Sequence, residues 1–232
     1  MRHYLVVDDN RAFAENLAEI VGDDGDDVCA TCDEAQALRL AGEHRFDVLV
    51  TDLRMPHMNG AELVQRARRV DPGVSAIAVT AYLRDRDLVR KEGLLAALPK
   101  PVPVNRLLDL MRSARRDGLA AVVEDDAAPC EELWEALRRR GFAVVSAASV
   151  LAAERLGPVM PFCALVDPSA PDRQAGEAVR ELSRKHALLP MLVLPQRDRK
   201  PPALGAGFPL SSFDAILEAV ERLYRSRPEA RE

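Results

Sequence analysis

Five side chains with the chemistry to hold a metal ion and a phosphoryl group each end or follow an apolar run of the sequence. They are Asp8, Asp9, Asp52, Thr80 and Lys100. Three carboxylates make a hard oxygen site of the kind that Mg²⁺ prefers. A hydroxyl and an ammonium group beside them suit phosphoryl oxygens. Alone, Asp52 could equally cap a loop, but the whole set predicts phosphoryl transfer onto a carboxylate nucleophile.

The apolar runs predict the strands that bring these groups together. We expect strands at 3–7, 28–31, 48–52, 74–79 and 94–98, and the intervals between them and the segment after the last show helical spacing of apolar residues. Such alternation is typical of an α/β doubly wound parallel sheet. Because the carboxyl ends of parallel strands meet at one edge, the five side chains should converge there.

Four segments carry a resemblance to a known family. They are VVDDN, VLVTDLRMPHMNG, VTAY and LPKP. In this order, residues 1–117 resemble the receiver domain of bacterial two-component response regulators. The resemblance implies a flavodoxin-like five-stranded sheet of order 2-1-3-4-5. It also implies that Asp52 takes a phosphoryl group from a sensor histidine kinase or phosphotransfer protein.

The same resemblance assigns roles around Asp52. Mg²⁺ would be held by Asp8, Asp9, Asp52 and the backbone carbonyl of Arg54, while Thr80 and Lys100 would contact the phosphoryl oxygens. Three positions depart from the family's pattern or leave a role open. Receivers carry Tyr or Phe three residues before the Lys, where this chain has Ala97. Tyr82 could serve as the switch instead or be an ordinary exposed tyrosine, and Arg54 could change the rate of hydrolysis of the acyl phosphate or have no such effect.

Residues 118–225 repeat the pattern of the first half. Glu124, Asp125 and Asp167 recur 115 to 116 residues after Asp8, Asp9 and Asp52. Pro195 stands where a hydroxyl is needed, and Phe208 where the Lys is needed. We therefore predict a second doubly wound sheet that acts as a pseudo-receiver for binding, rather than a second phosphorylation site. The three acids could still bind a metal.

Three further features of the second half are expected. The interval between its fourth and fifth strands spans 13 residues against 20 in the first half, so its fourth helix should be shortened or missing. Residues 226–232 form a polar tail that we expect to be disordered. The face exposed by the lost helix should pack against another domain or subunit, as in a homodimer, and phosphorylation of Asp52 should alter that contact.

Composition and charge argue against a DNA-binding protein, a membrane protein and a disulfide-bonded secreted protein. A net charge of −5 and no basic stripe argue against direct DNA binding. Without an apolar run of membrane-spanning length or a signal peptide, we expect a cytoplasmic protein with no membrane contact. Four cysteines fit a reducing compartment, and the C-x-x-C pair Cys29 and Cys32 is expected to be structural, with Cys29 buried in a strand.

Three functions compete. The leading one is a signalling module with no output enzyme domain, which acts through an unknown downstream protein. An aspartate-nucleophile phosphohydrolase is an alternative, but such enzymes place a second acid two residues after the nucleophile, where this chain has Arg54. A non-phosphorylated interaction scaffold is the third, and the complete set of five side chains argues against it.

Overall fold

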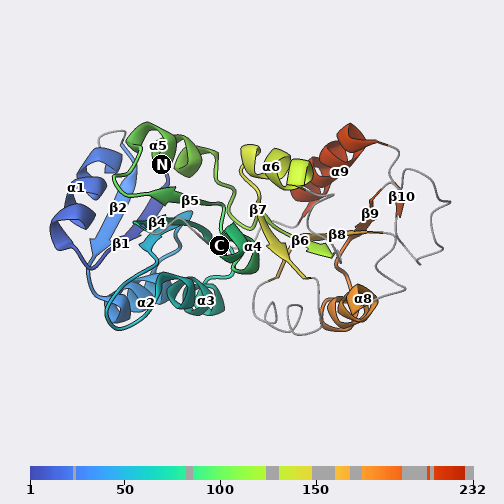
Figure 1. Cartoon of the computed structure of the whole chain (residues 1–232), viewed down its shortest axis with the longest axis horizontal. Coiled ribbons are helices and arrows are strands. Elements are labelled where there is room, and N and C mark those ends of the chain that lie inside the picture. Colours follow the sequence, from blue (N-terminus) through green and yellow to red (C-terminus); the bar gives the residue numbers. More distant parts are fainter. Residues whose placement is uncertain are drawn as a thin grey trace.

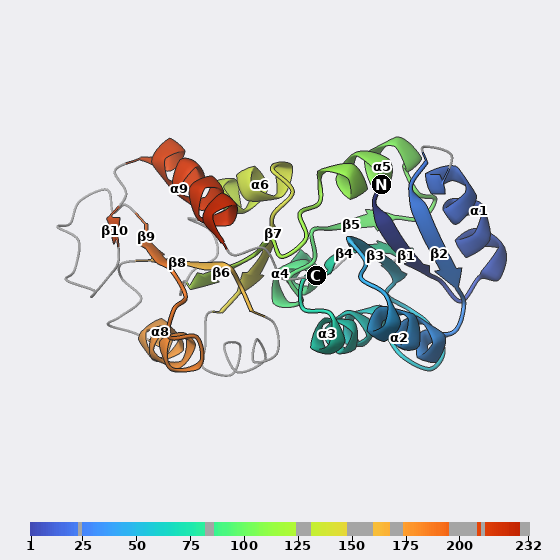
Figure 2. The same cartoon turned by 180° about the vertical axis from the view of Figure 1, so that it is seen from behind.

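Two parallel β-sheets lie side by side along the long axis of the molecule (Figures 1 and 2). The computed structural model describes residues 1–22, 25–81, 86–123, 131–147, 160–167, 174–194, 208–209 and 212–227. The first sheet and its helices are called the N-terminal unit here, and the second sheet and its helices the C-terminal unit. None of the described helices is long and apolar enough to cross a membrane.

The N-terminal unit alternates strand and helix five times. Its strands are β1 (His3–Val7), β2 (Asp27–Thr31), β3 (Val48–Asp52), β4 (Ser75–Thr80) and β5 (Ala96–Pro99). Its helices are α1 (Arg11–Gly22), α2 (Glu34–Glu43), α3 (Gly60–Val70), α4 (Arg86–Lys91) and α5 (Val104–Ser113). All strand pairs are parallel and the order is β2-β1-β3-β4-β5. The predicted doubly wound sheet of order 2-1-3-4-5 is confirmed.

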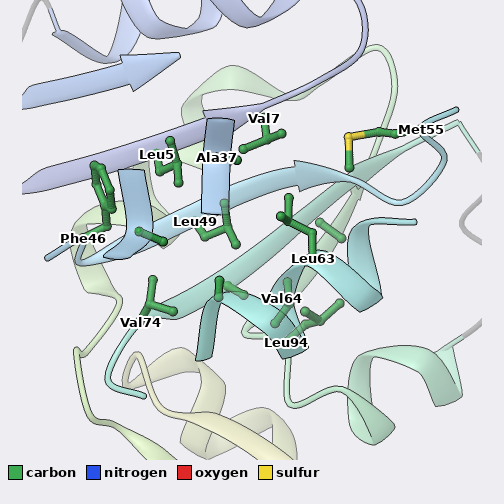
Figure 3. Packing of buried hydrophobic residues seen from close by; sticks show 14 of the residues in the cluster. Leu5, Val7, Ala37, Phe46, Leu49, Met55, Leu63, Val64, Val74 and Leu94 are labelled. Atoms are coloured by element: carbon green, nitrogen blue, oxygen red, sulfur yellow. The ribbon is translucent and has the colours of Figure 1, made fainter. Parts of the chain in front are cut away.

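Both faces of the first sheet are covered by helices, which explains its uninterrupted apolar strands. Helices α1 and α5 pack on one face against alternate residues such as Val48 and Val50. Helices α2, α3 and α4 cover the other face, where Leu49 contacts the cluster shown in Figure 3. The alternation along β3 thus buries every residue of the strand and leaves its carboxyl end as the place for Asp52.

The C-terminal unit has a second sheet with the same succession of strands. Its strands are β6 (Leu119–Val123), β7 (Ala143–Ser146), β8 (Cys163–Val166), β9 (Met191–Val193) and β10 (Phe208–Pro209), and its described helices are α6 (Glu131–Arg139), α8 (Gln174–Lys185) and α9 (Phe213–Ser226). The order is β7-β6-β8-β9-β10. Since β10 is only two residues long, four strands make up most of this sheet. Helices α6 and α9 cover one face and α8 the other.

Several predicted boundaries need correction. Strands β4 and β5 begin later than positions 74 and 94, because Val74 and Leu94 lie in the turns that lead into them. Helix α9 includes Ser226, and Arg227 donates hydrogen bonds to the carbonyls of Arg116 and Asp117, so disorder from position 226 is wrong for these two residues. Residues 195–207, where the fourth helix was predicted to be shortened or missing, lie outside the described part of the chain. The rest of the predicted tail, residues 228–232, also lies outside it.

The connection between the units is held from both sides by consecutive arginines. Arg116 makes a two-pronged ion pair with Asp71 at the end of α3 and also donates to the carbonyl of Phe46. Arg115 makes a two-pronged pair with Glu221 of α9, at 2.9 and 3.0 Å. Because neighbouring residues point into opposite units, the connection is a fixed joint rather than a loose linker.

Helix α4 is the second contact between the units, and it lies beside β7 in Figures 1 and 2. Arg90 pairs with Glu131 of α6, and its guanidinium lies 5.0 Å from the centre of the Trp134 ring. Gly93, with φ of 58°, follows the helix, and a Cβ there would lie 2.9 Å from Leu119. The C-terminal unit therefore rests directly on α4 and the turn after it.

The end of α4 is fixed from within the N-terminal unit by Arg68. Its buried guanidinium donates to the carbonyls of Glu92 and Gly93 at 2.7 and 2.8 Å, and to that of Val74. Burial lowers the pKa of Arg68 to about 10, although the charge of Glu92 opposes the shift. Arg68 thus provides donors for carbonyls that the end of a helix leaves unpaired.

Candidate metal and phosphoryl site

Three of the predicted carboxylates meet at the carboxyl ends of β1 and β3. Asp8 and Asp9 follow β1, Asp52 ends β3, and each offers an oxygen within 4.8 Å of the others. Asp8 and Asp52 are only 1% and 8% exposed, whereas Asp9 is open to solvent. Parallel pairing of β1 with β3 produces this meeting, since Val7 lies opposite Thr51. The donor set is hard oxygen with access from one side, which fits Mg²⁺.

Lys100 lies between the two buried carboxylates. Its Nζ donates to Asp8 Oδ2 at 2.5 Å and to Asp52 Oδ2 at 2.6 Å. The ammonium group also lies 4.6 Å from the centre of the Phe13 ring on α1. The helical spacing of apolar residues in the sequence does not predict this contact of Phe13 with Lys100. Lys100 thus brings a positive charge against both buried carboxylates.

Thr80 and Lys100 are brought together by the pairing of β4 with β5. Thr80 ends β4 opposite Pro99, and the backbone amide of Lys100 donates to the Thr80 carbonyl at 3.0 Å. Thr80 is 1% exposed. Four of the five predicted side chains are therefore held at strand ends by main-chain hydrogen bonds, and the fifth, Asp9, is adjacent to Asp8.

The loop after Asp52 holds its carboxylate in place. The amide of Arg54 donates to Asp52 Oδ1 at 3.0 Å, as the amide of Asn10 does to Asp8 Oδ1. Asn59 caps α3 by accepting from the amide of Glu62. Gly60 opens that helix against the Asp52 backbone, and a Cβ on Gly60 would lie 2.9 Å from the Asp52 carbonyl carbon.

Burial acts in opposite directions on the pKa values of Asp8 and Lys100, but the net pKa of each group is raised. Burial raises the pKa of Asp8, and the hydrogen bonds from Lys100 and Asn10 oppose this only in part. Burial would lower the pKa of Lys100, but its hydrogen bonds to Asp52 and Asp8 outweigh that effect and raise the pKa above the ordinary value. Lys100 therefore remains charged at neutral pH, while ionised Asp8 is held at a cost.

Some predicted site residues are not placed together by the described structure. Tyr82, Glu124 and Asp125 lie outside the described residues, so the predicted switch and most of the second site are not described. Asp167 follows β8 and donates its amide to the Val123 carbonyl at 2.9 Å. Ala97 lies on β5 and is partly buried. Cys29 packs partly buried on the core and Cys32 is exposed, both as free thiols.

The chain is similar to known proteins, both over its first half and over nearly its whole length. The family model of the response regulator receiver domain matches residues 4–112. A response regulator receiver protein of Anaeromyxobacter sp. (strain Fw109-5) is 54% identical over 231 residues, which cover 98% of this chain and 97% of its relative. Response regulator MprA of Mycobacterium ulcerans (strain Agy99) is 35% identical over 128 residues, covering 53% of each chain.

Among solved structures, a CheY-like response regulator receiver domain protein from Methanospirillum hungatei JF-1 is similar over 48% of this chain and 91% of its own, with 27% identity and a TM-score of 0.45. The fold and the strand-end site define a receiver domain of two-component signalling. With a relative similar over nearly its whole length, the chain belongs to the response regulator receiver proteins.

Proposed function

We propose that this chain is a response regulator in which Asp52 accepts the phosphoryl group of a phosphohistidine. Receiver domains obtain this group from sensor histidine kinases or phosphotransfer proteins. The observation that carries the proposal is the position of Lys100 Nζ, 2.6 Å from a buried Asp52 oxygen, beside two further carboxylates. No other described group of acidic or metal-ligating side chains has this composition.

The chemistry follows from the groups around Asp52. A carboxylate oxygen of Asp52 attacks phosphorus, the P–N bond breaks with its electron pair left on the imidazole nitrogen, and an acyl phosphate forms. The Arg54 amide fixes the carboxylate, while Lys100 and Thr80 bind phosphoryl oxygens. Mg²⁺ held by Asp8, Asp9, Asp52 and the Arg54 carbonyl would offset the charge that collects on those oxygens.

Phosphoryl uptake from a small donor tests this proposal. We expect incubation with phosphoramidate and Mg²⁺ to give an adduct that hydroxylamine removes, as it removes acyl phosphates, and that EDTA prevents from forming. A phosphohydrolase would instead turn over a generic phosphate ester, and a scaffold would form no adduct with any donor. The residue two positions after Asp52 is Arg54, where such a phosphohydrolase would have an acid, and this disfavours the hydrolase.

We also propose that the C-terminal unit is a pseudo-receiver that receives the signal rather than a phosphoryl group. Support comes from its strand order, which repeats that of the first sheet, and from Asp167 directly after β8. Thr80 ends β4, and α4 begins at Arg86, so movement at Thr80 reaches α4 over a short segment. Because Arg90 of α4 contacts Glu131 and Trp134, phosphorylation would change the contact between the units.

In this proposal the chain acts through protein contacts. It is not an enzyme beyond its own phosphorylation and dephosphorylation, and it signals through a downstream protein or a homodimer without binding DNA. Trp134 is the one tryptophan of the sequence and reports on the contact. We expect phosphorylation to change its fluorescence, and Arg90→Met to reduce that change; an unaltered spectrum on full phosphorylation would refute the coupling.

A further inference from the structure

A cavity of about 680 Å³ lies between the two units, outside the site at Asp52. Helix α5, β5 and the end of α4 form one side, and α6 forms the other. Its size is that of a pocket for a small organic molecule. Ala97 borders it together with Leu95 and Leu110, so an aromatic side chain at position 97 would occupy part of this space. Part of the cavity wall is therefore apolar.

The charged residues that line the cavity do not balance. Four arginines and three acidic residues face it, which leaves one net positive charge. Glu131 pairs with Arg90, and Glu135 pairs with Arg139 at 3.2 Å. After these pairs are set aside, Arg106 and Arg138 remain against Asp109 alone.

Arg138 lies where a counter-ion is missing. Its Nε and Nη2 are buried and have no hydrogen-bond partner in the described part of the chain. Its guanidinium lies 5.4 Å from the centre of the Trp134 ring, which also contacts Arg90. Burial, and then the charge of Arg90, lower the pKa of Arg138. A buried cation without an acceptor is costly, so an anion that supplied one would be favoured at this position.

We propose that this cavity binds a small organic anion whose phosphate or carboxylate group pairs with Arg138 and whose flat or apolar body lies against the wall around Ala97. A guanidinium binds either anion with two parallel hydrogen bonds. Since Nε and Nη2 are covered, Arg138 must turn toward the cavity to donate both. That movement takes its charge away from Trp134, so the ring reports occupancy. The ligand contacts both units and holds them together.

The test titrates the full chain in EDTA, which removes metal from the Asp52 site, and follows Trp134 fluorescence and calorimetric heat. The probes are two matched pairs at constant ionic strength: adenosine monophosphate with adenosine, and benzoate with benzamide. We expect saturable binding of at least one anion and none of its neutral partner. Binding of only the monophosphate assigns a phosphate ligand, and binding of only the benzoate assigns a carboxylate ligand.

Two substitutions decide whether the cavity is the site. Arg138→Met should weaken binding about tenfold or more, as expected for loss of a charge-assisted hydrogen bond, whereas Arg140→Met should leave binding unchanged because Arg140 is exposed and is not among the residues that line the cavity. Removing an uncompensated charge should not impair folding, and Arg138→Lys provides a second variant that keeps the charge but loses the two-pronged geometry. No saturable binding at millimolar concentration, equal binding of the neutral partners, or binding that survives Arg138→Met would overturn the proposal.

Discussion

Gly60→Ala tests whether the main chain of α3 sets the position of Asp52. The new Cβ would lie 2.9 Å from the Asp52 carbonyl carbon and 3.1 Å from Leu53 Cα, and closer still to the Asp52 carbonyl oxygen. These are main-chain atoms, so no side chain can rotate to make room. We expect the Asp52 backbone or the start of α3 to move by about 1 Å, and a misplacement of that size costs roughly 10²-fold in rate.

The assay is the initial rate of phosphoryl uptake from phosphoramidate with Mg²⁺, together with urea unfolding. Crowding of this kind should also destabilise the chain by about 1–3 kcal/mol. Gly42→Ala is the matched control, because Gly42 lies near the end of α2 and its Cβ would have no heavy atom within 4 Å. We expect the control to keep the wild-type rate and to be about 0.5–1 kcal/mol more stable.

A Gly60→Ala protein that takes up the phosphoryl group at the rate of the control, and unfolds at the same urea concentration, would refute a role of the α3 main chain in positioning Asp52. Circular dichroism of both variants distinguishes a displaced Asp52 from an unfolded chain. A folded Gly60→Ala protein with a slow rate supports the account, since only the position of the carboxylate has then changed.

Three further predictions concern the joint, the C-terminal unit and the metal site. Asp71→Asn should destabilise the chain by about 1.5–3 kcal/mol in urea unfolding, because it removes the carboxylate that pairs with partly buried Arg116, whereas Glu62→Gln, in an exposed ion pair, should cost less than about 1 kcal/mol; equal effects would contradict a fixed joint. Burial, and then the charge of Lys185, lower the pKa of His186 in the folded chain. Because the unfolded chain, with a His pKa of about 6.5, then binds the proton more readily, the free energy of unfolding should fall as the pH falls, and His186→Gln should show a smaller fall between about pH 7.5 and 5.5. Identical pH dependence of unfolding in both proteins would refute this. Since burial raises the pKa of Asp8, ionised Asp8 destabilises the metal-free chain, so Asp8→Asn should unfold at a higher urea concentration than the wild type in EDTA. Mg²⁺ at 100 times its Kd should stabilise only the wild type, by about 2.7 kcal/mol. Equal stabilisation of both proteins by Mg²⁺ would contradict the assigned ligands.

The sequence was enough to predict the first sheet and the groups at its strand ends. Asp52 and Thr80 each end an apolar run, and in a parallel sheet the ends of such runs meet at one edge. Two contributors could not be predicted in this way. The contact of Phe13 with Lys100 and the approach of Gly60 to Asp52 depend on how α1 and α3 pack, which helical spacing does not specify.

The connection between the units shows the same limit. The pairing of Arg116 with Asp71 and of Arg115 with Glu221 restricts movement between the units. The sequence did not indicate that neighbouring arginines would point into different units, because their partners lie far away in the chain. Strand boundaries at Val74 and Leu94 were misplaced because the apolar run continues into the turn before each strand.

Intact-mass analysis after incubation with Mg²⁺ and phosphoramidate tests the central claim most directly. The proteins compared are the wild type, Asp52→Asn and Asp167→Asn. We predict one phosphoryl group on the wild type and on Asp167→Asn, and none on Asp52→Asn. A phosphoryl group that remains on Asp52→Asn, or no adduct on any of the three, would contradict the assignment of Asp52 as the acceptor.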